Sequence, residues 1–294
     1  MDVFVTGASG YIGSEVTRTL VARGHRVRGL ARSTAAEERV RAAGGTPVLG
    51  GLTDLAVLAR EARAGDGVVH TAATGGPDRP DVDAAAVTAM LTAMTGGAFV
   101  TTTGAPRARS SREPVTEDDV ADAVGPLAWL AAAEARVLGA TNVTGAVVRP
   151  PVVYGDGTGP VAGLVAHARL VGAARYVDAG ANRWSTVHVR DLAVAYALIL
   201  ETGATGVFHA AETDPVPIAD LAAAIGDAAG VPVGSWPLTD AVAALGGTAA
   251  YLATDAALDA GRLRALGWRP AFGDAVDGVC GALRNPAQGY ALTA

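Results

Sequence analysis

Short apolar runs rich in β-branched residues alternate with longer Ala-rich stretches through the first half of the 294-residue chain. The short runs predict strands at residues 3–6, 26–30, 46–49, 67–71, 98–103 and 143–149. The longer stretches predict helices near residues 11–23, 35–43, 55–63, 82–94 and 127–138. Regular alternation of this kind is typical of a parallel sheet with helices on both faces. The pattern therefore predicts an α/β fold built on a doubly wound parallel sheet.

The pattern changes after Arg149. Prolines and glycines crowd residues 150–160 and predict a loop, and prolines also separate the later helical stretches. Residues 184–191, 192–200 and 207–210 again indicate a strand, a helix and a strand, so this part of the chain is expected to return to the main sheet. We therefore expect a first domain over residues 1–155, rejoined by residues 186–211, and a smaller lobe made mainly of residues 156–294.

Composition and charge narrow the classes of function. Hydrophobic residues make up 50% of the chain and charged residues 18%, which is typical of a globular protein and not of a disordered one. The 23 basic and 29 acidic residues give a net charge of −6, which disfavours nucleic acid or an anionic membrane as the main partner. A small-molecule ligand is therefore expected.

Two residue types are scarce. The chain has no lysine, so all 23 basic residues are arginine, and chemistry that needs a lysine amine, such as a Schiff base, is excluded. One cysteine, Cys280, excludes an intramolecular disulfide and a multi-cysteine metal site, and we expect no metal ion. The longest apolar run, residues 192–200, is too short to cross a membrane, and the first strand leaves no room for a signal peptide. A cytoplasmic protein is therefore expected.

A glycine triplet joins the first predicted strand to the first predicted helix. Residues 6–13 are Thr-Gly-Ala-Ser-Gly-Tyr-Ile-Gly, so glycines recur at intervals of three, at Gly7, Gly10 and Gly13. Gly7 permits a tight turn, Gly10 lets a pyrophosphate approach the backbone, and Gly13 allows the helix to pack closely on the sheet. The free N–H groups of the helix N-terminus attract the phosphate charge. This arrangement predicts a Rossmann-type dinucleotide site, with contacts from Gly7, Ser9, Gly10, Tyr11, Ile12 and Gly13.

The residues after the second predicted strand indicate which dinucleotide binds. An NAD-selective site places an acidic residue there on the ribose hydroxyls, whereas this chain has Arg32 and Ser33. A guanidinium and a hydroxyl suit a 2′-phosphate. The alternative is that Arg32 is an exposed loop charge. We expect the cofactor to be NADPH, and residues 1–155 to form an NADP-binding domain.

Together these segments resemble the extended and atypical short-chain dehydrogenase/reductases, a superfamily that includes nucleotide-sugar epimerases and 3β-hydroxysteroid dehydrogenases. The resemblance rests on the glycine loop and on motifs at residues 66–73, 149–155, 187–193 and 266–270. It implies that Ala72 and Ala73 lie along the cofactor and that Pro150 approaches the nicotinamide. It also implies that a hydroxyl at the end of the fifth strand, from Thr102 or Thr103, polarises the substrate oxygen. The alternative is that these threonines only pack in the strand.

The chain departs from that superfamily at the catalytic helix. Members carry Tyr-x-x-x-Lys there, in which the lysine lowers the pKa of the tyrosine and the tyrosine protonates the nascent alkoxide. Aligning Glu134 with the acidic residue that commonly follows the lysine puts Pro126 and Leu130 at the two positions. Neither side chain can transfer a proton, and the absence of lysine makes this conclusion independent of the alignment. The chain therefore resembles atypical members that lack the pair.

Aromatic side chains in the second half are candidates for contact with substrate. Tyr154 follows the sixth strand and is expected near the nicotinamide pocket, with packing beneath the interdomain loop as an equal alternative. Tyr176, Trp184 and Trp236 fall in the smaller lobe and could stack on a flat aromatic molecule, although isolated aromatics are more often core residues. The smaller lobe is therefore expected to bind the substrate.

These expectations combine into one hypothesis and two alternatives. The hypothesis is NADPH-dependent reduction of a ring ketone on a polycyclic aromatic polyketide, of the angucyclinone type, to a secondary alcohol. A phenol beside the ketone would supply the proton that the missing tyrosine cannot, with the advantage of an intramolecular donor. The alternatives are a catalytically inactive regulatory protein that senses NADP(H), and a dehydratase or cyclase that uses the fold without redox chemistry. The resemblance also allows a homodimer.

Overall fold

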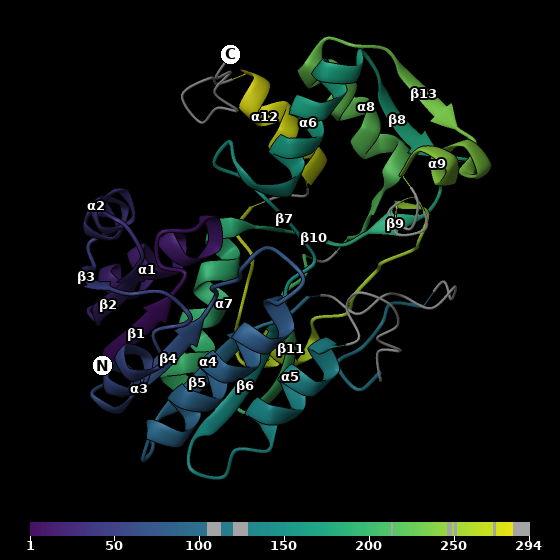
Figure 1. Cartoon of the computed structure of the whole chain (residues 1–294). Helices are drawn as coiled ribbons and strands as arrows, with labels where there is room; N and C mark the ends of the chain where they lie inside the picture. Colours follow the sequence, from purple (N-terminus) through teal and green to yellow (C-terminus); the bar gives the residue numbers. More distant parts are fainter. Residues whose placement is uncertain are drawn as a thin grey trace.

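The computed structural model describes residues 1–104, 113–119, 129–212, 214–245, 249, 252–272 and 275–284. Its centre is a seven-stranded sheet in the order β11-β6-β5-β4-β1-β2-β3, in which every neighbouring pair is parallel. Helices lie on both faces of this sheet (Figure 1), which confirms the predicted α/β fold with a doubly wound parallel sheet. The strand order changes direction beside β1, and folds of this kind bind ligands beyond the carboxyl ends of the strands at such a point.

The elements of the main sheet follow the predicted order. Its strands are β1 (Asp2–Thr6), β2 (Arg26–Ala31), β3 (Thr46–Leu49), β4 (Gly67–His70), β5 (Ala98–Thr102), β6 (Thr144–Arg149) and β11 (Gly206–His209). The helices beside it are α1 (Tyr11–Ala22), α2 (Thr34–Ala42), α3 (Leu55–Arg63), α4 (Arg79–Ala93), α5 (Trp129–Leu138) and α7 (Val189–Thr202). α4 begins before its predicted start because Pro80 is well suited to the first turn of a helix.

Alternate residues of the strands supply two separate cores. On β1, Val3 and Val5 are fully buried in a core with Leu20 of α1 and Leu192 of α7. Phe4 points to the other face, where its core includes residues of α3, α4 and α5. Because successive strand residues face opposite sides of a sheet, the continuous apolar runs of the sequence are covered by helices on both faces.

The chain enters the smaller lobe from the carboxyl end of β6. Its elements are β7 (Val152–Tyr154), α6 (Gly159–Val171), β8 (Ala174–Val177), β9 (Arg183–Trp184), β10 (Thr186–His188), β12 (Val216–Pro217), α8 (Ile218–Ala229), β13 (Val233–Trp236), α9 (Leu238–Leu245) and α12 (Ala275–Arg284). The short helix α11 (Gly261–Ala265) instead packs beside β11 of the main sheet. A core between α6, α8 and α12 holds this lobe together, at the top of Figure 1. None of the helices in the described part of the chain is long and apolar enough to span a lipid bilayer.

The segment expected to return to the main sheet divides between two sheets. β10 pairs in parallel with β7, at Val187 beside Val153, in a separate two-stranded sheet. β11 pairs in parallel with β6 and forms the edge of the main sheet. The short strand β7 lies inside the stretch predicted to be only a loop, because Val152, Val153 and Tyr154 separate its prolines from its glycines. The paired strands β7 and β10 connect the main sheet to the smaller lobe.

A buried carboxylate, Glu212, joins the segments that connect the two parts. Its Oε1 accepts hydrogen bonds from the Tyr154 hydroxyl and the His188 backbone N–H, both at 2.9 Å, and its Oε2 accepts one from the Thr186 hydroxyl at 2.7 Å. Burial raises the pKa of this carboxyl to about 7, although the three donors oppose the shift. Ionisation of Glu212 therefore lowers the stability of the folded protein.

We expect Glu212→Gln to remove a pH dependence of stability. Glu212 keeps its proton in the folded protein up to about pH 7, whereas the unfolded chain loses it near the ordinary pKa of 4.5. The folded state therefore binds more protons between these values, and the unfolding free energy of the wild-type protein falls as the pH rises through this window. In the variant, the amide oxygen can accept from Tyr154 and His188 while the amide N–H donates to Thr186.

Urea unfolding of both proteins between about pH 5 and pH 8 measures the effect. The stability of the variant relative to the wild type should rise by about 1 to 3 kcal/mol across this range. Other groups that titrate, such as His209, are common to both proteins and cancel in the difference. A difference that stays constant with pH would show that Glu212 does not retain its proton in the folded state.

Candidate cofactor and substrate site

The glycine triplet brings β1, α1 and β4 into close contact. Gly7 has a left-handed φ of 71°, and a Cβ on it would lie 2.7 Å from the backbone nitrogen of Ala72, just after β4. A Cβ on Gly13 would lie 2.1 Å from the carbonyl oxygen of Gly7. Neither position has room for a side chain. These contacts put the N-terminus of α1 at the carboxyl edge of the sheet.

Gly10 has a different role, because it is exposed. A Cβ there would meet only the carbonyl oxygen of Gly7, at 3.1 Å. Gly10 is the N-cap residue of α1, and no side chain caps the first N–H groups of that helix. Ser9 and Ile12, in the same loop, are half-buried. The loop therefore offers free backbone donors and space for a pyrophosphate, so the residues present fit a dinucleotide.

The other residues expected along the cofactor also follow strands of this sheet. Ala72 and Ala73 come after β4, where Ala72 is half-buried and Ala73 is exposed. Pro150 comes directly after β6 and is buried. Because all strands of the sheet are parallel, the residues that follow them share the edge at which α1 begins.

Arg32 and Ser33 lie at the end of β2, which is the neighbour of β1. Arg32 is exposed and has no hydrogen bond or ion pair with another residue in the described part of the chain. Ser33 caps α2, because its hydroxyl accepts a hydrogen bond from the backbone N–H of Ala36 at 3.3 Å. Arg28, on the same strand, is already paired with Glu61. Arg32 is therefore the free guanidinium at this end of β2.

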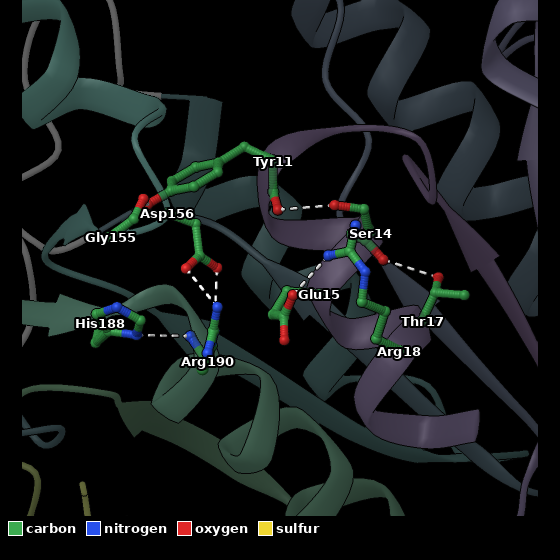
Figure 2. Close-up of polar contacts among 10 residues, drawn as sticks. Tyr11, Ser14, Glu15, Thr17, Arg18, Gly155, Asp156, His188 and Arg190 are labelled. Atoms are coloured by element: carbon green, nitrogen blue, oxygen red, sulfur yellow. Dashed lines mark hydrogen bonds and ion pairs between the residues drawn. The ribbon is translucent and has the colours of Figure 1, made fainter. Parts of the chain in front are cut away.

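Tyr11, in the first turn of α1, contacts the smaller lobe. Figure 2 shows its ring pointing to Gly155, in the segment between β7 and α6, and its hydroxyl donates a hydrogen bond to the Gly155 carbonyl oxygen at 2.9 Å. Tyr11 is also one of the residues expected to contact the cofactor through the glycine loop, so the hydrogen bond to Gly155 is a second contact. It had no sequence signal, because the two residues are 144 positions apart.

Thr102, the last residue of β5, belongs to a partly buried chain of hydrogen bonds. Its hydroxyl donates to the carbonyl oxygen of His70 at 3.0 Å and lies 2.7 Å from the hydroxyl of Tyr196 on α7. Since Thr102 has one proton to donate, Tyr196 is the donor in the second bond. Tyr196 is fully buried, and burial raises the pKa of its phenol above the ordinary range.

Thr103, the next residue, belongs to a second buried network. Its hydroxyl donates to Oε1 of Glu134 on α5 at 2.8 Å. Arg149 binds both oxygens of the same carboxylate, at 2.8 and 2.5 Å. Each of the two expected catalytic hydroxyls thus donates its proton to a protein oxygen. To polarise a substrate oxygen, either threonine must exchange one of these bonds.

The helix that carries the catalytic pair in relatives offers no replacement among the residues described. Pro126 lies outside the described residues. Leu130, at the expected lysine position, is a half-buried residue in the first turn of α5. Glu134 follows one turn later and is bound to Arg149 and Thr103. Sequence analysis used Glu134 only to align this helix and did not predict its partners, which come from β6 and the end of β5.

Three of the four aromatic candidates line one apolar cavity in the smaller lobe. Tyr176, Trp184 and Trp236 surround a space of about 190 Å³ together with apolar residues of α6 and α8. The guanidinium of Arg175 lies over the Trp236 ring, 5.0 Å from its centroid. Tyr154 is not among the lining residues. It is fully buried, its hydroxyl bonds to Glu212, and its ring contacts the neighbouring core.

Metal ligation has no support in the part of the chain that the structure describes. No group of three or more His, Cys, Asp or Glu side chains is arranged there to hold a metal ion. At the carboxyl edge of the sheet, Glu134 is bound to Thr103 and Arg149, and Thr102 is bound to His70 and Tyr196.

Comparison with known proteins identifies the family. The model of the NAD dependent epimerase/dehydratase family matches residues 3–96. An uncharacterized protein of Saccharomyces cerevisiae is 32% identical over 282 residues, which cover 92% of this chain and 95% of that protein. The 4-hydroxy-2-methyl-3-oxo-4-farnesyl-3,4-dihydroquinoline-1-oxide ketoreductase of Stigmatella aurantiaca is 32% identical over 264 residues, which cover 83% of this chain and 78% of that enzyme.

Solved structures share the fold. A UDP-glucose 4-epimerase of Thermus thermophilus in complex with NAD has a TM-score of 0.75 at 23% identity, covering 97% of this chain and 99% of that one. A human epimerase family protein with NADPH has a TM-score of 0.74 at 21% identity, covering 97% and 100%. With the matching family model and whole-length relatives, the chain belongs to the NAD-dependent epimerase/dehydratase family, the extended short-chain dehydrogenase/reductases, whose members use a nicotinamide dinucleotide.

Proposed function

We propose that this protein is an NADPH-dependent ketoreductase that reduces a ring ketone of a polycyclic aromatic polyketide, of the angucyclinone type, to a secondary alcohol. In this proposal a phenol of the substrate, beside the ketone, protonates the developing alkoxide. The observation that carries the proposal is the absence of lysine from the whole chain, together with the hydrogen bonds that the Thr102 and Thr103 hydroxyls donate to protein oxygens.

The described groups near this edge are poor proton donors for a bound ketone. Thr102 and Thr103 donate their protons to His70 and Glu134. Tyr196 is fully buried, with a raised pKa, and donates to Thr102. At the end of β11, burial lowers the pKa of His209 to about 4, so this ring is neutral at pH 7. A protein acid equivalent to the missing tyrosine is therefore not provided by these residues.

Substrate-assisted protonation compensates for the missing tyrosine. Losing a positioned general acid costs about 10²- to 10⁴-fold in rate. A phenol has a pKa near ~10, close to that of the tyrosine it replaces. Attachment next to the carbonyl gives it the high effective concentration of an intramolecular donor.

Reduction of the carbonyl group requires one hydride from the cofactor and one proton from the phenol. NADPH, when bound, supplies the hydride that the carbonyl carbon accepts. The carbonyl oxygen then becomes an alkoxide and takes the phenol proton. The phenolate recovers a proton from water, so the products are the secondary alcohol and the oxidised cofactor.

The cavity of the smaller lobe limits how the substrate can bind. An apolar cavity of about 150 Å³ accommodates benzene, so the cavity of about 190 Å³ has room for one or two fused rings. Its aromatic lining, with Tyr176, Trp184 and Trp236, favours a flat aromatic part of the molecule. The remaining rings of a polycyclic substrate, including the reacting ketone, would lie outside the cavity. The Stigmatella relative is named as a ketoreductase of a 3-oxo-dihydroquinoline-1-oxide, which supports a ring ketone as the reacting group.

The free guanidinium of Arg32 supports NADPH as the cofactor. It lies at the end of β2, where the ribose of the adenosine part is held in such folds, and the described residues leave it without a partner. An unpaired guanidinium binds a phosphate by charge-assisted hydrogen bonds. NADH has no 2′-phosphate to make this contact.

We expect Arg32→Ala to weaken NADPH binding about 10- to 100-fold, since hydrogen bonds to charged groups contribute about 1.5 to 3 kcal/mol. The dissociation constant for NADH should change by less than about twofold, because that cofactor lacks the phosphate. Titration calorimetry with both cofactors measures these constants. Arg63→Ala, which removes an exposed arginine at the end of α3, is the matched control and should change neither value. An equal loss for both cofactors in Arg32→Ala would remove the 2′-phosphate assignment.

Two ketones that differ only in methylation of the phenol oxygen test the source of the proton. The first carries a free phenol beside the carbonyl of a polycyclic aromatic ketone, and the second is its O-methyl ether. We expect NADPH consumption, followed by absorbance, to be about 10²- to 10⁴-fold slower with the ether. Equal rates would contradict substrate-assisted protonation, as would a comparable loss of rate in Tyr154→Phe with the free phenol.

The same assay separates the alternatives. A regulatory protein that senses NADP(H) would bind the cofactor and oxidise none of it with any ketone. A dehydratase or cyclase would form product while the NADPH absorbance stays constant. Either result would overturn the ketoreductase proposal.

A further inference from the structure

The segment from the end of β7 to Gly159, the first residue of α6, has several residues with positive φ. Four of its residues have positive φ: Gly155 at 108°, Asp156 at 51°, Gly157 at 70° and Gly159 at 82°. We call residues 155–159 the clasp loop. It lies between the first turn of α1 and the start of α7, as Figure 2 shows for Gly155 and Asp156. Such a loop has many accessible conformations, so its order depends on the contacts made to it.

Tyr11 holds the clasp loop from α1. Its hydroxyl donates to the Gly155 carbonyl oxygen at 2.9 Å. At the other end of the loop, a Cβ on Gly159 would lie 2.3 Å from a ring carbon of Tyr11. The phenol therefore contacts both ends of the loop, by a hydrogen bond at Gly155 and by packing at Gly159.

α7 holds the same loop from the opposite side. Arg190 donates to both oxygens of Asp156, at 2.7 and 3.2 Å. A Cβ on Gly155 would lie 2.2 Å from Nε2 of His188. The Arg190 and Asp156 side chains are 54% and 32% exposed, so this ion pair contributes little to stability. The hydrogen bond from Tyr11 is partly buried and is the better defined of the two polar contacts.

We propose that Tyr11 is a positioning residue that couples occupation of the dinucleotide site to the order of the smaller lobe. Tyr11 lies in the first turn of α1, whose uncapped N–H groups face the expected pyrophosphate. A dinucleotide bound there orders this turn, and the Tyr11 hydroxyl then holds Gly155. The clasp loop leads directly into α6, which supplies Leu164 and Ala168 to the apolar cavity. Cofactor binding thereby orders one wall of the substrate site before the ketone enters.

This inference rests on the dinucleotide site of the proposed function, but its test does not require turnover. Amide hydrogen exchange is measured for peptides covering residues 7–14 and 152–165, with and without NADP⁺, in the wild type and in Tyr11→Phe. The variant keeps the aromatic ring and removes only the hydroxyl. In the wild type we expect NADP⁺ to slow exchange in both peptides.

In Tyr11→Phe, measured at an NADP⁺ concentration that saturates the variant, we expect NADP⁺ still to slow residues 7–14, because the backbone N–H groups of this turn remain. Its effect on residues 152–165 should be about 2- to 10-fold smaller, which corresponds to the loss of one hydrogen bond. A purely structural role for the hydroxyl would speed exchange of the clasp loop equally with and without NADP⁺. The NADP⁺-dependent ratio is therefore the decisive measurement.

Ser14→Ala is the matched control. It removes a hydroxyl from the same turn of α1, and among the contacts described this hydroxyl bonds only to the Tyr11 carbonyl oxygen. Its NADP⁺-dependent ratio for residues 152–165 should equal that of the wild type. An unchanged ratio in Tyr11→Phe would overturn the coupling, while leaving the dinucleotide site in place. Failure of NADP⁺ to slow residues 7–14 in the wild type would instead overturn the dinucleotide site itself.

Discussion

The close approach of α1 to the end of β4 is the constraint on which the rest of the site depends. It is possible only because Gly7 and Gly13 lack side chains: a Cβ at either position would lie within 3 Å of backbone atoms. The approach puts the uncapped start of α1 at the edge shared by the carboxyl ends of the strands. In the proposed function, a dinucleotide bound there would extend from Arg32, after β2, towards Pro150, after β6. This one packing contact would then set the position of the phosphate groups, the adenosine part and the reacting ring together.

The polar groups at this edge illustrate how burial restricts chemistry. A buried hydroxyl or carboxylate needs partners, and here Thr102, Thr103 and Glu134 find them in Tyr196, His70 and Arg149. Groups satisfied in this way stabilise the fold, but their protons are directed to protein oxygens. In the proposed function this edge would position a hydride donor and a ketone and would supply no protein acid from these three side chains. The source of the proton moves to the substrate in the proposed reaction.

Among the described residues, several polar contacts join the two parts of the molecule at their junction. Glu212 links β7 to β10 from within, and Tyr11 and Arg190 hold the clasp loop from the side of the sheet. These contacts differ in chemical type, because one depends on the protonation of a carboxyl group and another on a hydroxyl hydrogen bond. Ionisation of Glu212 opposes the packed arrangement above about pH 7, whereas the Tyr11 contact is a hydrogen bond from a hydroxyl to the backbone carbonyl oxygen of Gly155. Stability and coupling between the parts can therefore be changed separately by substitution.

The sequence by itself determined the alternating strands and helices, the glycine loop and the lack of a Tyr/Lys pair, because each depends on local periodicity, on backbone freedom at single positions or on composition. It also singled out Arg32, Thr102 and Thr103, since their places follow from the ends of strands. Only the tertiary structure decided which side chains form hydrogen bonds with the two threonine hydroxyls, that β10 pairs with β7, and that the Tyr11 hydroxyl bonds to Gly155. These contacts join residues far apart in the chain. Their geometry depends on the packing of whole elements, and no local pattern of residues encodes it.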